Sequence, residues 1–457
     1  MKKTMLQQLL RDQSVMKNDT ALDALKAQGK ALRDTIPAET LGERTLSGRD
    51  PVAYIEAIEQ NLIQELMPQR HAKMAASPAA FFRGTAELMA YDLSHEPQSG
   101  IRVLSDGDAH LQNFGFYASP ERNLLFDLND FDEAAPNSFE FDLKRLATSV
   151  YLLGAQRHFD EAPMDDLVQN LVRTYRKALK HAFKEGALER FYASSNVEQL
   201  LAALPDEDDV EFVKRVMAKA QKQTNESVVA KYTERATATR LRFKDAAPRS
   251  VHVEPGREIA LMRGYLDYQK TTRADITLLL GQYHVSDIIR HSVGIGSFGT
   301  YCYLILLTGL GGSHLVLQVK EALPRRRELA PNNLAVTLDR EVSEGQRIIA
   351  AQQILQKASD PFLGWFNLDG KSFYVRQFRD MKESINLDRL EWGQFEAYCR
   401  ICAYLLAMAH AQSPTAAVAD GYLNRDVDIA IQGWAKDYLH QVVDDYAAFV
   451  AKYGVDQ

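Results

Sequence analysis

The chain of 457 residues carries a formal net charge of −7 at pH 7, and 46% of its residues are hydrophobic and 25% charged. These proportions are typical of a globular protein, and the length allows two or three domains. The negative charge argues against nucleic acid or an anionic membrane as a partner, and no apolar run is long enough for a membrane-spanning helix.

The first hundred residues are predicted to be helical. Polar side chains interrupt the opening MKKTMLQQLLRDQSV, so we expect a helix there rather than a signal peptide. Residues 50–74 carry apolar side chains at helical spacing, and Ser77-Pro78 is a typical N-cap followed by proline at the first helical position. Without a secretion signal, and with three cysteines in all, the chain is expected in the reducing cytoplasm.

The next stretch changes character. IRVLS (101–105) and NLLFDL (123–128) are short apolar runs bounded by Gly, Asp and Asn, and they predict two strands flanked by loops. Helix is predicted again over residues 139–193. Residues 204–250 open with the acidic run PDEDDVE and continue as a helix rich in lysine and arginine, which we interpret as an inter-lobe linker.

Strands dominate residues 284–320. YCYLILLTG (301–309) and HLVLQVK (314–320) are joined by LGGS, a sequence typical of a hairpin turn. A helix over 340–358 and a short strand, KSFYVRQFRD (371–380), are predicted to follow.

The chain ends in helices. Cys399 and Cys402 form a C-x-x-C inside one of these helical patterns, so we expect them to pack rather than to bind zinc or undergo redox chemistry. The elements together predict an α+β fold. Its predicted regions are a helical N-terminal region (1–100), a helical lobe with the polar loops (101–250), a β-rich lobe (280–384) and C-terminal helices that complete the helical lobe (385–457).

VGIGSFG places Gly294, Gly296 and Gly299 in the spacing G-x-G-x-x-G, with Ser297 among them. A dinucleotide site would need a helix directly after the glycines, but the β-rich run TYCYLILLTG follows. The glycines are therefore expected at a strand-to-strand turn, where such a loop covers the phosphates of a nucleotide.

Lys320 closes the strand HLVLQVK and shares a face with Val316 and Gln318. A lysine alone at a strand end would be expected to reach into solvent. Beside a glycine turn, it predicts a ligand for nucleotide phosphates. Glu344 on the next helix is the expected partner of its ammonium, with Glu341 as the alternative.

Asp108 and Asn113 in VLSDGDAHLQNFG have the spacing D-x-x-x-x-N. One such loop supplies a carboxylate for an acceptor hydroxyl and an oxygen ligand for Mg²⁺. Asp127 and Asp130 follow the next strand, where a second metal ligand would be needed. His110 has no second histidine at metal-ligand spacing, so we expect it to shape the loop.

Many ordered runs between about residues 45 and 440 resemble the bacterial DUF2252 family. The runs that carry the resemblance are FFRGTAELMAYDL, GDAHLQNFG, FDLNDFDE, FEFDLKRLATS, VGIGSFGTYCYLILLTG, LQVKEA, SDPFLGW, YVRQFRDMK and LAMAHAQS. GDAHLQN and FDLNDFDE are also similar to the loops of aminoglycoside-phosphotransferase and choline-kinase-like enzymes, which have a protein-kinase-like fold. That similarity implies a catalytic Asp108 and Mg²⁺ binding by Asn113 and Asp130, the latter favoured over Asp127 by its spacing to Asp142.

Two features depart from this broader group. Asp106 replaces the histidine that precedes Gly-Asp, and the glycine loop and lysine follow the catalytic loop instead of preceding it. A circular permutation reconciles the order if the helix RLEWGQFEAYCRICAYLLAMAHAQS packs beside residues 101–113.

We therefore expect an ATP- and Mg²⁺-dependent phosphotransferase acting on a small-molecule hydroxyl or amine. The alternatives are nucleotidyl (AMP) transfer with ATP reversed and a nucleotide-binding regulatory module without catalysis. Arg83, Arg376 and Arg379 could contact phosphates, but a surface or structural ion pair is expected for each. The residues expected to hold ATP are Gly294, Gly296, Ser297, Gly299, Lys320 and Glu344.

Overall fold

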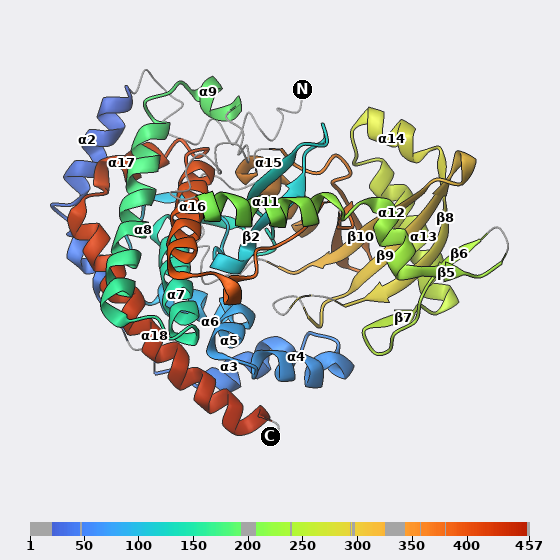
Figure 1. Cartoon of the computed structure of the whole chain (residues 1–457), viewed down its shortest axis with the longest axis horizontal. Helices are drawn as coiled ribbons and strands as arrows, with labels where there is room; N and C mark the ends of the chain where they lie inside the picture. Colours follow the sequence, from blue (N-terminus) through green and yellow to red (C-terminus); the bar gives the residue numbers. More distant parts are fainter. Residues whose placement is uncertain are drawn as a thin grey trace.

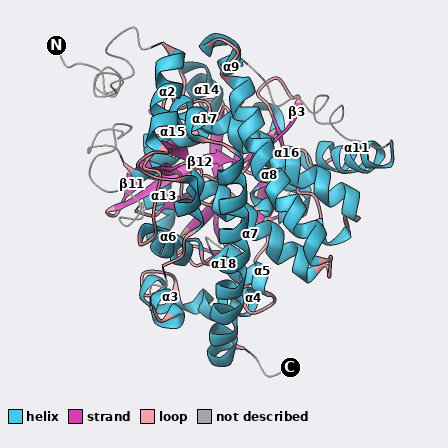
Figure 2. Cartoon of the chain, turned by 90° about the vertical axis from the view of Figure 1, so that its left-hand side faces the viewer, coloured by secondary structure: helices cyan, strands magenta, loops and turns pink. Residues whose placement is uncertain are grey.

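The computed structural model describes residues 21–45, 48–192, 207–237, 240–292, 294, 298–324, 343–356, 358–379 and 381–454. It confirms the expected mixture of helices and strands. In Figure 1 the helices from both ends of the chain gather on one side, and one antiparallel sheet lies on the other. Figure 2 looks onto the helical side, where α7, α8 and α18 lie close together.

The described part of the N-terminal region contains helices joined by loops and no strand, as predicted, whereas the helix predicted over residues 1–15 lies outside the described residues. Ser77 accepts a hydrogen bond from the backbone of Ala80 at 3.1 Å and Pro78 opens the helix that follows, so the predicted cap is present. The elements are α2 (Leu22–Leu32), η2 (Ala38–Gly42), α3 (Pro51–Glu59), η3 (Gln64–Leu66), α4 (Met67–Met74), α5 (Pro78–Gly84) and α6 (Ala86–Ser94).

The polar loops lie among short strands. The two predicted strands are present, but each pairs with a strand that the sequence pattern did not reveal, so two antiparallel pairs form, β1 with β4 and β2 with β3. The elements are β1 (Arg102–Ser105), η4 (Leu111–Asn113), β2 (Phe114–Ala118), β3 (Leu124–Leu128) and β4 (Ala135–Ser138), followed by α7 (Glu140–Gln156), α8 (Glu161–Ala182) and α9 (Ala187–Tyr192).

The segment interpreted as a linker is less continuous than predicted. Its helix is interrupted where Thr224 caps a second helix through its hydroxyl, and the chain then turns into a short hairpin instead of extending the helix. The first helix, α11, lies between the helical side and the sheet in Figure 1. The elements are α11 (Glu207–Gln221), α12 (Asn225–Tyr232), β5 (Thr233–Arg235), β6 (Leu241–Phe243), β7 (Ser250–His252), α13 (Pro255–Gln269) and α14 (Ala274–Leu280).

The sheet has six antiparallel strands in the order β11-β12-β10-β9-β8-β7. The predicted LGGS hairpin is confirmed, because Gly311 and Gly312 supply left-handed backbone at φ 72° and 78° between β9 and β10. The elements are β8 (Tyr283–His291), β9 (Cys302–Gly309), η5 (Leu310–Gly312), β10 (His314–Ala322), α15 (Glu344–Leu355), β11 (Gly364–Leu368) and β12 (Lys371–Gln377).

The two faces of β10 meet different surroundings. Leu315, Leu317 and Val319 enter the apolar core between the sheet and α13, as their alternation predicts. Lys320 is opposite Tyr374 of β12 in the register, and Gln318 is opposite Arg376. Because alternate residues share a face, these four polar side chains lie on the other side of the sheet, which faces the helical part.

The C-terminal helices complete the helical side. α16 packs beside residues 101–113 as expected, with the Tyr398 hydroxyl donating to the carbonyl oxygen of Leu111 at 2.7 Å. Ser413, just after α16, accepts from the backbone of Leu104 at 2.8 Å. The elements are η6 (Leu387–Arg389), α16 (Trp392–His410), α17 (Ala416–Tyr422) and α18 (Arg425–Tyr453).

Cys399 and Cys402 are fully buried on α16 and, like Cys302, are free thiols. This agrees with the expectation that they pack. Across the described ranges, no helix combines the length and the apolar composition needed to cross a membrane.

Candidate active site

The loop between β1 and β2 is fixed by its backbone. The amides of Asp106 and Gly107 donate to the two carboxylate oxygens of Asp142 at 2.8 and 2.9 Å. Gly107 has φ 80°, and a Cβ there would lie 2.3 Å from the carbonyl oxygen of Glu133. The turn therefore requires glycine both for its conformation and for its close approach to the segment after β3.

Asp142 is in turn bound by His410 at the end of α16. His410 Nε2 lies 2.9 Å from Asp142 Oδ2, and His410 Nδ1 lies 2.7 Å from the hydroxyl of Tyr175. His410 and Asp142 are 0% and 1% exposed. A helix from the far end of the chain thus anchors the loop after β1. The sequence pattern did not indicate His410, although its run LAMAHAQS is among those that carry the family resemblance.

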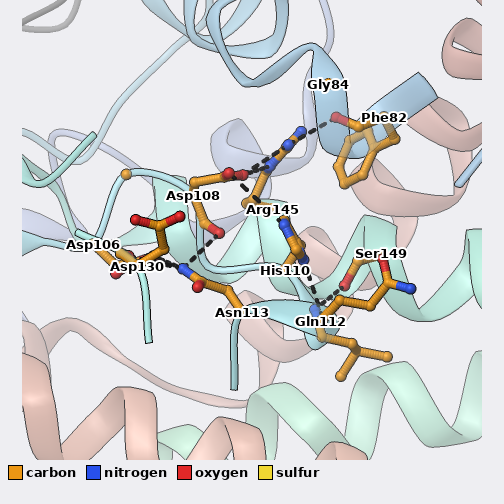
Figure 3. A network of polar contacts seen from close by, with 12 residues as sticks. Phe82, Gly84, Asp106, Asp108, His110, Gln112, Asn113, Asp130, Arg145 and Ser149 are labelled. Atoms are coloured by element: carbon orange, nitrogen blue, oxygen red, sulfur yellow. Dashed lines mark hydrogen bonds and ion pairs between the residues drawn. The ribbon is translucent and has the colours of Figure 1, made fainter. Parts of the chain in front are cut away.

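Asp108, the predicted catalytic residue, lies against Arg145 of α7 (Figure 3). Arg145 Nε donates to Asp108 Oδ1 at 2.8 Å, and its Nη2 donates to the carbonyl oxygen of Phe82 at 2.8 Å. The Arg145 side chain is 3% exposed and that of Asp108 is 22% exposed. Arg145 therefore orients the carboxylate while leaving part of it open. Arg145 is a second residue that the sequence pattern did not indicate.

His110 has the structural role expected from the sequence. Its Nδ1 accepts a hydrogen bond from the backbone of Gln112 at 3.1 Å and so caps η4. Burial, with the nearby Arg145 and Arg83, lowers the pKa of His110 well below its usual value. The ring is therefore neutral at pH 7 and holds the loop in shape.

Asn113 joins the loop after β1 to the loop after β3. Its Nδ2 donates to Asp106 Oδ2 at 2.9 Å and to the carbonyl oxygen of Asp130 at 3.0 Å. Figure 3 shows these side chains converging. Asp106 Oδ1 and Asp130 Oδ1 are buried and accept no hydrogen bond from the described residues.

Asp106 is a third candidate that the sequence reasoning treated only as a substitution. It is 0% exposed, and burial together with the nearby Asp142 and Asp108 raises the pKa of its carboxyl well above its usual value. A buried carboxylate oxygen without a donor is costly unless a proton or a cation satisfies it. Asp106 therefore belongs among the groups that could face a cation.

The two candidate metal ligands after β3 lie in different surroundings. Asp127 is on β3 opposite Gly115, and its Oδ1 accepts from the backbone of Leu128 at 3.0 Å. Asp130 Oδ1 lies 3.5 Å from Lys320 Nζ. Burial would raise the pKa of Asp130, but Lys320 and the nearby arginine of β12 hold it below its usual range. Asp130, rather than Asp127, is thus brought to the lysine.

Lys320 is 3% exposed and reaches the polar loops. Its ammonium pairs with Asp132 as well as with Asp130, and Asp132 also accepts a hydrogen bond from the Tyr374 hydroxyl at 2.7 Å. Burial disfavours the charged lysine, yet the two carboxylates raise its pKa well above the usual value. Lys320 is therefore a buried cation held by the segment after β3.

The prediction that Glu344 pairs with Lys320 was wrong. Glu344 pairs with Arg347 on its own helix at 2.5 Å, and Glu341 lies outside the described residues. Arg347 also donates to the carbonyl oxygen of Asp132 at 2.9 Å. Helix α15 therefore supports the lysine indirectly, because it holds the backbone of the loop that carries Asp132.

The glycine segment lies between two paired strands, β8 and β9, as predicted. Gly296 and Ser297 lie outside the described residues. Gly299 has φ 111°, and its carbonyl oxygen accepts from the backbone of Ile63 at 2.8 Å. Lys73 of α4 donates to the carbonyl oxygen of Gly294 at 3.2 Å. The N-terminal helical region therefore holds both described ends of this segment.

A cavity of about 280 Å³ lies between the sheet and the loop after β3. Gly294, Lys320 and Asp130 line it, whereas Asp108 and Asn113 do not. Four further cations line the same cavity, namely Arg83, Arg376, Arg379 and Lys382.

The ion pairs expected for the three arginines are absent. Within the described residues, none of the four cations forms an ion pair with a carboxylate. Arg376 donates instead to Gln318 Oε1 at 2.9 Å. Burial and the neighbouring Arg376 lower the pKa of Lys382 to about 7. The cavity is therefore crowded with positive charge.

The comparisons identify a family. The family described as "Uncharacterized protein conserved in bacteria (DUF2252)" matches residues 62–452. Searches of curated proteins and of solved structures gave no match. The match spans the polar loops, the glycine segment and the sheet described above. The chain therefore belongs to the DUF2252 family of bacterial proteins.

Proposed function

We propose that this chain is an ATP- and Mg²⁺-dependent phosphotransferase with a kinase-like, circularly permuted fold, acting on a hydroxyl or amine of a small molecule. The observation that carries the proposal is the ion pairing of Lys320 with Asp130 and Asp132. This ion pairing joins the sheet to the loop after β3. Asn113 in turn connects that loop to the predicted catalytic loop through its hydrogen bond to the carbonyl oxygen of Asp130. A glycine turn, a lysine and an Asp/Asn loop are the parts that position a nucleotide triphosphate in kinase-like enzymes.

The oxygen atoms around Asn113 suit Mg²⁺. Asp106 Oδ1 is buried and accepts no hydrogen bond from the described residues, and Asp130 Oδ1 lies 3.5 Å from the Lys320 ammonium. Mg²⁺ is usually bound through one or two carboxylates and completes its shell with water and phosphate oxygens. Asp130 and Asn113 would hold the ion, with Asp106 behind them. When bound, the ion would supply positive charge that offsets the negative charge developing on the transferred phosphoryl group.

The described residues contain no group of three or more His, Cys, Asp or Glu side chains arranged to hold a metal by themselves. An Mg²⁺ ion at this site would therefore need further oxygen ligands from water and nucleotide phosphates.

The chemistry follows from the position of each side chain. The acceptor oxygen or nitrogen would form a bond to the γ-phosphorus. The bond between the γ-phosphorus and the oxygen that bridges the β- and γ-phosphates would break, which releases ADP. Asp108 would accept the acceptor's proton, and Arg145 keeps that carboxylate in place. Lys320 would bind phosphate oxygens.

The contacts of α16 support the permuted order. In a kinase-like fold the helix before the catalytic loop is continuous with it. Here α16 packs beside the loop without that continuity, through Tyr398 to Leu111 and Ser413 to Leu104. His410 at the end of α16 binds Asp142 and so secures the loop whose preceding histidine is replaced by Asp106.

The full-length protein tests this proposal by calorimetric titration with MgATP and by ³¹P NMR of MgATP with water as the acceptor. We expect MgATP to bind, ATP without Mg²⁺ to bind more weakly, and turnover to yield ADP and phosphate. Asp108→Asn should abolish turnover but retain binding, because Arg145 can still donate to the amide oxygen. Asp267→Asn, at an exposed position on α13, is the matched control and should turn over like the wild type.

Other products would distinguish the alternatives. AMP and pyrophosphate would show nucleotidyl transfer, in which the bond between the α- and β-phosphates breaks. Binding without turnover in the wild type would support a regulatory module. Failure of any adenine nucleotide to bind would overturn the proposal.

A further inference from the structure

The cavity holds more positive charge than its own carboxylates balance. Lys320 is paired with Asp130 and Asp132, and Asp360, the other acid that lines the cavity, accepts hydrogen bonds from the backbone of Phe362 and Gln377 at 2.8 and 2.5 Å. Asp130 and Asp360, the two acids that line the cavity, form no ion pair with Arg83, Arg376, Arg379 or Lys382 among the described residues. The chain as a whole has a net charge of −7, so the excess of cations is local.

Two of these cations have no hydrogen-bond acceptor among the described residues, namely Arg83 and Arg379. The guanidinium of Arg379 lies near two rings, 5.4 Å from the centroid of Phe378 and 5.8 Å from that of Tyr232. Arginine normally uses its planar donors in pairs, on a carboxylate or a phosphate. Both side chains therefore present unused donors to the cavity.

The backbone also holds Arg379 in a costly conformation. Its φ is 58°, in the left-handed region, and Met381 has φ 48°. Residues other than glycine adopt this region rarely, and strained backbone of this kind is enriched at functional sites.

Arg83 lies on the side of the cavity next to the predicted catalytic loop. It also lines a small adjoining hollow together with His110, Gln112 and Ser149. Its charge is one of the causes of the lowered pKa of His110. The guanidinium is therefore a neighbour of the loop where Asp108 would meet an acceptor.

We propose that the cavity binds, beside the nucleotide, an anionic small molecule whose phosphate or carboxylate group is held by Arg83 and Arg379, and that this molecule is the acceptor. The inference rests on the proposed phosphotransferase function, whose acceptor class it specifies. Lys320 and the Mg²⁺ ligands serve the donor phosphates, whereas Arg83 and Arg379 serve a second anion.

Titration of inorganic phosphate, and separately of acetate, into the full-length protein saturated with Mg²⁺ and the non-hydrolysable analogue AMP-PNP tests the proposal. Phosphate or acetate should bind to the saturated protein, and the tighter of the two identifies the anion. Arg83→Gln and Arg379→Gln should each weaken this binding about tenfold, the size of one lost charge-assisted interaction. Their affinity for AMP-PNP should change by less than about threefold.

The matched control is Arg263→Gln, at an exposed position on α13 away from the cavity, which should bind the anion like the wild type. Because no described residue accepts a hydrogen bond from the Arg83 or Arg379 side chain, both variants are expected to fold, and urea unfolding checks this. Loss of anion binding on saturation with AMP-PNP would overturn the proposal, because the arginines would then hold the nucleotide's own phosphates. Unchanged anion affinity in both variants would also overturn it.

The result separates this proposal from the proposed function. If AMP-PNP does not bind while phosphate or acetate still binds and depends on Arg83 and Arg379, the phosphotransferase is wrong and the anion site stands. If AMP-PNP binds and neither phosphate nor acetate does, the anion site is wrong and the phosphotransferase proposal stands.

Discussion

His410 of α16 and Asp142 of α7 form a buried hydrogen bond of 2.9 Å between residues 268 positions apart in the chain. Through it, the C-terminal helices hold the loop that carries Asp108. We expect His410→Leu to lower the free energy of unfolding by about 1 to 3 kcal/mol for each buried group it leaves without a partner, here Asp142 and Tyr175. Urea unfolding measures this.

His440→Leu is the control for that variant, because His440 is exposed on α18. Its unfolding free energy should stay within about 0.5 kcal/mol of the wild type. An equally small effect of His410→Leu would contradict the anchoring role.

Two glycines with similar backbone angles should respond differently to alanine. Gly107 and Gly100 have φ 80° and 71°, but a Cβ at Gly107 would lie 2.3 Å from a backbone oxygen, whereas nothing lies within 4 Å at Gly100. Gly100→Ala should cost about 1 kcal/mol from the left-handed conformation alone. Gly107→Ala should cost more than twice as much and should also impair turnover, since the loop must move. Equal costs in chemical unfolding would show that the loop adapts freely.

Asp132, rather than Glu344, is the carboxylate that matters to Lys320. Asp132→Asn removes the close partner of a buried ammonium and should lower the free energy of unfolding by about 1.5 to 3 kcal/mol. Glu344→Gln weakens only a pair within its own helix and should cost less than about 1 kcal/mol. Urea unfolding of the two variants measures both free energies. A larger loss in Glu344→Gln than in Asp132→Asn would favour Glu344 as the partner of Lys320, as predicted from the sequence.

Anion binding should depend on pH through Lys382. Its pKa is lowered to about 7, so its side chain is charged below that pH and becomes neutral above it. Sulfate, whose charge is constant in this range, should therefore bind more weakly as the pH rises from 6 to 8. Lys382→Met should flatten this dependence. Lys177→Met, at an exposed position on α8, should keep it, and a flat wild-type profile would contradict the lowered pKa.

The local features of the fold were predicted from the sequence because their causes lie within a few residues. The Ser77 cap, the glycine turn after β9 and the alternation along β10 each depend on neighbours in the chain. The same holds for the placing of Gly294 and Gly299 between two strands. β2 (FGFYA) and β4 (APNS) are short and show no alternation of polar and apolar side chains, so their pairing could not be predicted.

The partners of the polar side chains were decided by the tertiary structure. Nothing near Lys320 in the sequence shows that Asp132, 188 positions earlier, meets its ammonium, nor does the pattern around Arg83 show that no carboxylate reaches it. The sequence determined which residues stand at the ends of strands and in loops, because backbone geometry is local. Which of these residues meet was decided by the packing of α7, α16 and the sheet, because charge pairing depends on distances in space.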